Sequence, residues 1–104
     1  MLNVPKELLS YHAEGMPLCC DLDESPFACE FWPLGELDAY NSDYEVPEYA
    51  PGFLGFGTSG GGEMFAFSVD GKIVSLPFIG MAPDAAMLIA ESWVEFEGKL
   101  RNAL

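Results

Sequence analysis

The chain has 104 residues, half of them hydrophobic, and its four Lys and Arg side chains stand against seventeen Asp and Glu, which gives a formal net charge of −13. A chain of this length predicts one domain, residues 1–104, that buries enough apolar surface to fold without disulfides or bound metals. The negative field repels a nucleic-acid backbone and an anionic membrane surface, so the composition argues against both as partners.

The N-terminal part of the sequence predicts one short helix followed by an acidic segment. Pro5 to Tyr11 forms the helix, because proline suits a first helical turn and Gly15 can end it. His12 lies near that end, where a protonated imidazole would favour the helix dipole. The acidic stretch from Cys19 to Ser25 predicts a loop or the edge of a strand.

A strand and a second helix are predicted next. Alternation from Phe27 to Pro33 predicts the strand, with Trp32 on one of its faces. The residues predicted on its other face are Phe27, Cys29 and Phe31. Leu34 to Asn41 predicts a short helix, and the two prolines between Asp43 and Pro51 predict an ordered loop.

The segment from Gly55 to Phe67, GFGTSGGGEMFAF, has five glycines in its first eight residues and raises the question of a phosphate-binding loop. Such a loop needs Lys and then Ser or Thr after its last glycine, at the start of a helix. Gly62 is instead followed by Glu63, whose charge would repel phosphate, and then by a strand pattern. The glycines therefore predict a turn with positive φ angles, between a short strand at Gly52 to Phe56 and a second strand.

A β-hairpin is predicted after the glycines. Its strands are Met64 to Val69 and Lys72 to Phe78, with Asp70-Gly71 between them. This dipeptide favours a type I′ turn, in which both central residues take positive φ. Pro77 marks a sheet edge or the end of the strand. An exposed edge there would support a homodimer, and the sequence leaves monomer and homodimer open.

The C-terminal part predicts a helical turn from Ala82 to Ala86 and a last helix that begins at Ser92. Ser92 and Glu95 form a capping box, in which the hydroxyl caps the Glu95 amide and the carboxylate reaches back to Ser92. The apolar stripe of this helix consists of Trp93, Phe96 and Leu100. Trp32 and Trp93 both belong to amphipathic elements, which favours the core over a ligand pocket.

The sequence lacks the residue sets that catalysis and metal binding need. One histidine is the only candidate base for its serines, and no nucleophile elbow is present. Cys19, Cys20 and Cys29 lack the C-x₂-C spacing of structural zinc sites, so the pattern predicts reduced thiols, no metal and no cofactor. The N-terminal residues show no signal-peptide pattern, and we expect a cytoplasmic protein that is not an enzyme.

Acidic residues are concentrated in one part of the sequence. Between Lys6 and Lys72 there are thirteen acidic residues and no basic one. Such a charge either serves solubility alone or attracts a cationic partner and speeds its encounter. The second interpretation predicts a basic protein as partner, and Tyr beside carboxylates is typical of binding hot spots. The candidate partner-binding residues are Asp21, Asp23, Glu24, Asp43, Tyr44, Glu45, Glu48 and Tyr49.

Four segments carry a family resemblance when they are taken together. They are VPKELL at 4–9, FWPLGEL at 31–37 with Asn41 after it, FGTSGGGEMFAF at 56–67, and the stretch from Val74 to Leu100 that contains PFIGM and IAESWVEFEGKL. Their order and spacing, over roughly residues 4–100, resemble the SUKH superfamily, a group that includes bacterial immunity proteins and fungal regulators of cell-wall synthesis.

The resemblance implies a fold and a class of function. It implies a single α+β domain with a mostly antiparallel, twisted sheet and helices packed around it, and it implies no catalysis. Many bacterial members bind and neutralise a toxin, often a nuclease, whose phosphate-binding site is cationic and would attract an acidic inhibitor. The alternative is an orphan scaffold or small-ligand-binding domain of the same fold, in which the acidity serves only solubility.

Overall fold

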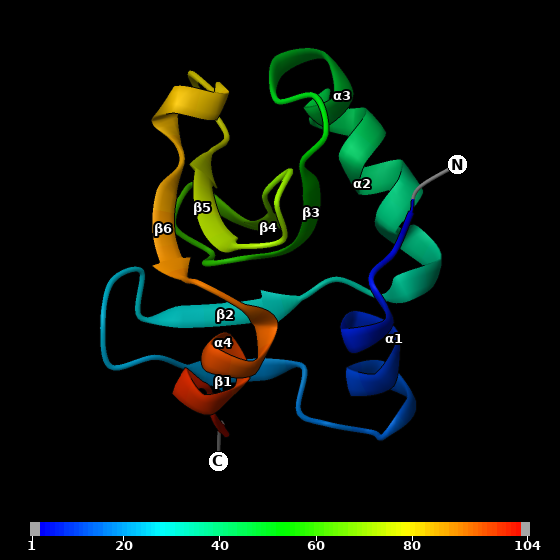
Figure 1. Ribbon diagram of the computed structural model, residues 1–104, viewed down its shortest axis with the longest axis vertical. Coiled ribbons are helices and arrows are strands. Elements are labelled where there is room, and N and C mark those ends of the chain that lie inside the picture. Colours follow the sequence, from blue (N-terminus) through cyan, green and yellow to red (C-terminus); the bar gives the residue numbers. More distant parts are fainter. Residues whose placement is uncertain (1–2, 103–104) are drawn as a thin grey trace.

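The computed structural model describes residues 3–102 and has the predicted α+β fold (Figure 1). Seven antiparallel strands form one curled sheet in the order β6-β5-β4-β3-β2-β1-β7. The strands are β1 (Cys19–Asp21), β2 (Ala28–Phe31), β3 (Leu54–Thr58), β4 (Glu63–Phe67), β5 (Ile73–Pro77), β6 (Met87–Ala90) and β7 (Arg101–Asn102). The first six strands are therefore a meander, and the last strand returns to the free edge of β1.

Four α-helices and two short 3₁₀ turns accompany the sheet. The helices are α1 (Lys6–Ala13), α2 (Leu37–Asp43), α3 (Val46–Tyr49) and α4 (Trp93–Lys99), and the 3₁₀ turns are η1 (Leu34–Glu36) and η2 (Pro83–Ala85). In Figure 1, α2 and α3 lie along one side of the molecule beside β3, and α4 lies beneath the curl of β3–β6. The two groups of helices therefore cover different parts of the sheet.

The core is an aromatic cluster between α4, α1 and one face of the sheet. The Trp93 ring on α4 lies 5.8 Å from Phe56 and 5.7 Å from Phe67, measured between ring centroids. The Tyr11 ring on α1 stacks on Phe31 at 4.6 Å. Burying such rings removes much apolar surface from water, and their offset and edge-on contacts add to that gain. This cluster joins elements from both ends of the chain.

The start of α4 confirms half of the predicted capping box. The Ser92 hydroxyl accepts a hydrogen bond from the Glu95 amide at 3.2 Å. The Glu95 carboxylate accepts from the amide of Glu91 at 2.6 Å, one residue earlier than predicted. Both tryptophans lie in the core, as expected, because Trp32 and Trp93 are each 5% exposed.

The predicted hairpin is present, but its turn is of a different type. Phe67 pairs with Ile73, so the connection spans five residues rather than two. Gly71 alone carries the positive φ, at 85°, while Asp70 does not. The Ser68 hydroxyl accepts a hydrogen bond from the Lys72 amide and so helps to close the longer loop. The prediction of a type I′ turn was therefore wrong.

The sheet edges also differ from the prediction. Pro77 ends β5 opposite Glu63, as one alternative required, but β5 is an inner strand because β6 pairs with it. The β6 pairing covers β5 from Ile73 to Ser75 and stops two residues before Pro77. Strands β6 and β7 were not predicted, because MLIA lacks alternation and the last strand has only two residues. The helical turn predicted from Ala82 to Ala86 is present as η2, which lies between β5 and β6.

Two further local predictions need correction. Phe27 precedes β2 with a positive φ of 72° and is 60% exposed, so it does not share the buried face of Cys29 and Phe31. The predicted loop from Asp43 to Pro51 contains the last residue of α2 and all of α3. Glu45, at φ 59°, provides the left-handed step between the two helices. Pro47 then suits the first turn of α3.

His12 is not the exposed cation that its position near a helix end suggested. Its Nε2 atom is buried and has no hydrogen-bond partner among residues 3–102. Its ring lies edge-on to Phe31, with 6.0 Å between centroids. Burial lowers the pKa of His12 below its usual value of 6.5, so the neutral imidazole is the form that the fold accommodates.

We expect the free energy of unfolding to fall as the pH is lowered from 7.5 to 5.5. The unfolded chain binds a proton at His12 near pH 6.5, whereas the folded chain binds it only at lower pH. Stability is therefore complete above the unfolded pKa and is lost as the pH falls through it. Urea unfolding of the native protein and of His12→Gln at several pH values measures the effect. The His12→Gln curve should be flatter, and parallel curves would contradict the assignment.

Candidate functional site

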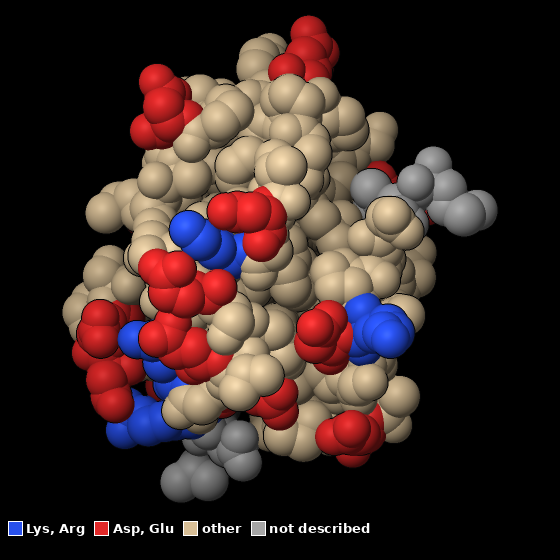
Figure 2. Space-filling model, viewed as in Figure 1, with Lys and Arg blue, Asp and Glu red and all other residues tan. Residues whose placement is uncertain are grey.

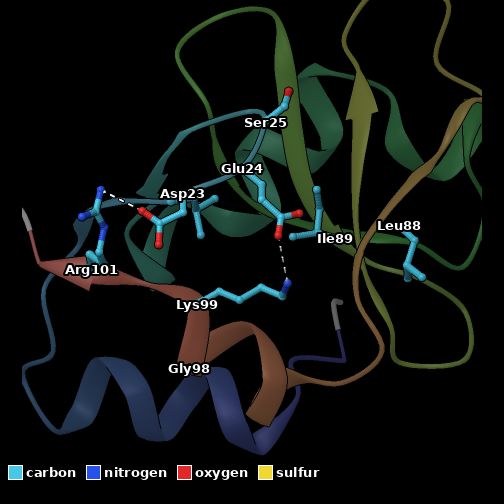
Figure 3. Close-up of a pocket in the computed structure, with 9 residues that line it drawn as sticks. Asp23, Glu24, Ser25, Leu88, Ile89, Gly98, Lys99 and Arg101 are labelled. Carbon is cyan, nitrogen blue, oxygen red and sulfur yellow. Dashed lines mark ion pairs between the residues drawn. The ribbon is translucent and has the colours of Figure 1, made fainter.

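The eight candidate residues form two groups with different electrostatic surroundings. Asp21 ends β1, and Asp23 and Glu24 lie in the loop between β1 and β2, all exposed. Arg101 Nη2 lies 3.2 Å from Asp23 Oδ1, and Lys99 Nζ lies 3.8 Å from Glu24 Oε2 (Figure 3). Two of the three carboxylates thus already have cationic partners from this chain.

These ion pairs could not be predicted from the sequence, because their partners lie far apart along the chain. Lys99 and Arg101 are more than 70 residues from the carboxylates, and β7 brings them close by pairing with β1. Figure 2 shows basic side chains set among acidic ones at the lower end of the molecule. Exposed ion pairs of this kind contribute little to stability, about 0–1 kcal/mol each. They do, however, reduce the field that this group offers to a cationic partner.

A cleft of about 390 Å³ opens beside these ion pairs (Figure 3). It lies between the two edges of the curled sheet, because edge strand β6 contributes to one wall, and Arg101 of edge strand β7 contributes to the other together with the loop after β1. Leu22, Leu88 and Ile89 supply apolar lining, and Asp23, Glu24, Lys99 and Arg101 supply equal numbers of the two charges. The cleft therefore carries no net charge from its lining.

The second group of candidates comes together around one hollow. Asp43, Tyr44, Glu45 and Tyr49 line it, and the chain after β5 closes it from the other side. The hollow has a volume of about 410 Å³, and its remaining lining residues are Phe78, Gly80 and Met81. Glu48 lies on α3 next to this group, exposed and outside the lining.

Within residues 3–102, the carboxylates of this hollow have no cationic partner. Every ion pair in the part of the chain that the structure describes involves Lys72, Lys99 or Arg101, and none reaches Asp43, Glu45 or Glu48. The nearest basic residues along the chain are Lys6 and Lys72, and Lys72 pairs with Asp70 and Glu91 instead. The negative field at this hollow is therefore not neutralised locally.

A stack of aromatic rings supports one wall of the hollow. The Tyr44 ring lies 4.4 Å from Phe78 and 5.9 Å from Trp32, measured between centroids. Trp32 in turn stacks on Tyr40 at 4.4 Å with planes 11° apart. Tyr44 is held in place by this stack and is still 40% exposed, and Tyr49 is 50% exposed. The hollow thus combines fixed aromatic surface with free carboxylates.

The glycine-rich segment is a turn and leaves no cradle for phosphate. The Gly60 amide donates to Thr58 Oγ1 and the Gly61 amide donates to Ser59 Oγ, both at 3.0 Å. The Ser59 hydroxyl donates to the Glu63 carboxylate at 2.8 Å. These bonds use the amides that a phosphate would need. The predicted turn with positive φ is confirmed, at 80° for Gly60 and 100° for Gly62.

The thiols are poor candidates for chemistry. Cys20 and Cys29 are buried, and burial raises the pKa of both, which disfavours the reactive thiolate. The Cys20 sulfur lies 3.4 Å from the hydroxyl of Tyr11, whose pKa burial also raises. Cys19 is exposed and unpaired with any other cysteine. Across residues 3–102, no set of three or more His, Cys, Asp or Glu side chains is placed to hold a metal ion.

No helix within the described part of the chain combines the length and apolar character needed to cross a membrane. No family model and no curated protein matches this sequence. The resemblance to the SUKH superfamily therefore stays a prediction, and the geometry of the hollow is the strongest evidence about function.

Proposed function

We propose that this protein is a non-catalytic binding module that captures a basic protein through the acidic-aromatic hollow. We define this hollow by Asp43, Tyr44, Glu45 and Tyr49, with Glu48 at its margin. The observation that carries the proposal is the absence of cationic partners for these carboxylates among the described residues. Free carboxylates beside exposed tyrosines are the combination expected of a surface that recognises a cationic protein.

The charge of the whole protein supports the same kind of partner. A net charge of −13 steers a basic protein toward the surface and can raise its association rate at low salt by about 10-fold or more. The loop after β1 contributes to this long-range field. Its Asp23 and Glu24 form ion pairs with Arg101 and Lys99, so these carboxylates are less available for direct contact with a partner.

The SUKH resemblance supports a finer proposal, that the partner is a toxin and that binding neutralises it. A nuclease is a suitable target class, because its site is built to hold phosphate and is therefore cationic. In this proposal the protein is an immunity-type inhibitor in the cytoplasm, where its thiols stay reduced. The inhibitor needs no catalytic group of its own, since occupying the cationic site is enough.

The cleft beside the two ion pairs supports the alternative, a small-ligand-binding domain, less well. Its lining charges already pair with each other, at 3.2 and 3.8 Å. A charged ligand would have to displace one of these pairs, and the cleft has no net charge with which to select it. The hollow has the opposite property, because its carboxylates are unpaired within residues 3–102.

Charge reversal at the hollow tests the proposal. The immobilised protein is exposed at low salt to lysate of its host, and Glu45→Lys/Glu48→Lys is compared with the unchanged protein. We expect a stoichiometric basic partner to associate at least about tenfold more slowly with the variant, because reversal turns attraction into repulsion at the contact. Association rates of the purified partner measured by surface plasmon resonance check this, and inhibition of its nuclease activity checks the finer proposal.

Glu7→Lys/Glu14→Lys is the matched control. Both residues are exposed at α1, away from the lining of the hollow, and the double reversal changes the net charge by the same amount. Equal slowing by the two variants would show that the charge acts only as a general field, and it would reject the hollow as the contact. Loss restricted to the hollow variant supports the proposal.

A further inference from the structure

We propose that the hollow receives an arginine side chain of the partner, in preference to lysine. The inference rests on the proposed function, because it names the group by which a basic protein would be recognised. It goes further by assigning one chemical group to one place in the structure. The place is the hollow itself, where the exposed parts of Tyr44 and Tyr49 line the same space as Asp43 and Glu45.

The aromatic lining provides flat surface for a planar cation. Phe78 and Tyr44 pack against each other, with ring centroids 4.4 Å apart and planes 33° from parallel, so the fold has already ordered both rings. Tyr44 is 40% exposed, and that exposed part is the surface it offers to a cation. Tyr49, from α3, is half exposed and contacts no other aromatic ring within the described part of the chain. A guanidinium stacks on such rings, and it loses less hydration than an ammonium when it does so.

The carboxylates provide the second half of the recognition. Asp43 and Glu45 flank Tyr44 in the sequence, and all three line the hollow. A carboxylate pairs with the fork of N–H groups on a guanidinium through two parallel hydrogen bonds, which the point charge of an ammonium cannot reproduce. Stacking surface next to acceptor oxygens therefore matches arginine in both shape and charge.

Among residues 3–102, no basic side chain forms an ion pair at this position. The ion pairs of Lys72, Lys99 and Arg101 lie with Asp70, Glu91, Glu24 and Asp23, none of which lines the hollow. The hollow has a volume of about 410 Å³, and its lining residues Tyr44 and Tyr49 are 40% and 50% exposed. An incoming arginine therefore meets free acceptors and does not have to break an internal ion pair first.

Three short peptides probe the site. They are N-acetylated and C-amidated Gly-Gly-X-Gly-Gly, with X as arginine, lysine or citrulline, and each is titrated into the full chain at low salt. We expect the arginine peptide to bind about fivefold more tightly than the lysine peptide, as the extra stacking on exposed rings allows. Citrulline keeps the planar shape without the charge and should bind at least about tenfold more weakly. Amide chemical shifts locate the contact, which we expect at Tyr44, Glu45 and Tyr49.

Variants connect the selectivity to the named groups. Asp43→Asn/Glu45→Gln should reduce the affinity for the arginine peptide at least about fivefold, and Tyr49→Ala should reduce the preference for arginine over lysine. Glu7→Gln/Glu14→Gln removes the same charge elsewhere and should leave the preference unchanged. An unchanged amide spectrum away from the substitutions verifies that each variant is folded.

The outcomes separate this inference from the proposed function. Equal affinities for the arginine and lysine peptides, or shifts that fall outside the hollow, would overturn the inference. If charge reversal at Glu45 and Glu48 still slows a basic partner in that case, the proposed function stands without it. Arginine preference located at the hollow and lost in Asp43→Asn/Glu45→Gln supports the inference, whether or not the lysate contains the partner.

Discussion

Gly57→Ala is expected to lower the free energy of unfolding by about 3 kcal/mol or to prevent folding. A Cβ atom at this position would lie 2.6 Å from the carbonyl oxygen of Glu30 and 3.3 Å from the Cα of Phe31. Both atoms belong to the backbone of β2, which pairs with β3 at this point. The backbone of β2 could move away only by breaking its pairing with β3. The steric clash therefore cannot be relaxed without losing hydrogen bonds of the sheet. Urea unfolding followed by tryptophan fluorescence measures the loss.

Gly61→Ala is the matched control for this prediction. Its Cβ would meet nothing closer than the Ser59 hydroxyl oxygen at 3.7 Å, and Gly61 does not have a positive φ. We expect a change within about 0.5 kcal/mol, as for an ordinary surface substitution. If both substitutions cost the same, the spacing between β2 and β3 is not what requires glycine at position 57.

The glycine-rich segment shows how far the sequence could predict the fold. A turn followed by a strand could be predicted from the sequence, because Gly60 and Gly62 can take positive φ and Glu63 is followed by an apolar run that forms β4. The requirement at Gly57 could not be predicted in this way. It depends on the approach of β2, a strand 26 residues away along the chain, and local propensity contains no information about that contact.

The two groups of candidate site residues differ in the same way, because one depends on neighbours in the sequence and the other on contacts between distant segments. Asp43, Tyr44, Glu45 and Tyr49 are neighbours in the sequence, and two short helices keep them together, so a sequence pattern could identify them. Phe78 completes the hollow from another part of the chain, and no local signal indicated that. The neutralisation of Asp23 and Glu24 was missed for the same reason, because their partners arrive with β7.

Burial of alternating residues was predicted well where one strand face meets the core. Cys29 and Phe31 are buried as expected, and so is Trp32 on the opposite face, because Tyr40 covers it. The prediction that Phe27 is buried was wrong, because the chain turns at this residue before the strand begins. Its positive φ could not be expected, since a bulky residue rarely takes that conformation. A pattern of alternation can extend past the end of the strand that produces it.

Asn41→Ala is expected to lower the free energy of unfolding by about 3 kcal/mol. The side chain is 1% exposed and connects α2 to β3 through both of its polar atoms. Its Oδ1 accepts from the Gly55 amide at 2.8 Å, and its Nδ2 donates to the carbonyl oxygens of Gly55 and Leu37, each at 2.9 Å. The register of β3 and β4 shifts between Gly55 and Gly57, so the side-chain amide supplies bonds next to an irregularity in the ladder. Alanine would leave the Gly55 N–H and C=O buried without these partners.

Two comparisons separate this role from simple loss of volume. Ser42→Ala, at the exposed neighbouring position in α2, should change stability by less than about 0.5 kcal/mol. Asn41→Leu keeps the branched shape and leaves no cavity but makes no hydrogen bond, so it should cost nearly as much as Asn41→Ala. Hydrogen exchange gives the local test, because the Gly55 amide should lose protection beyond the global change in both Asn41 variants. If Asn41→Leu were as stable as the native protein, packing rather than hydrogen bonding would hold α2 on β3. Tyr40 and Tyr44 would then depend on that packing for their place beside the hollow, since both lie on or next to the same helix.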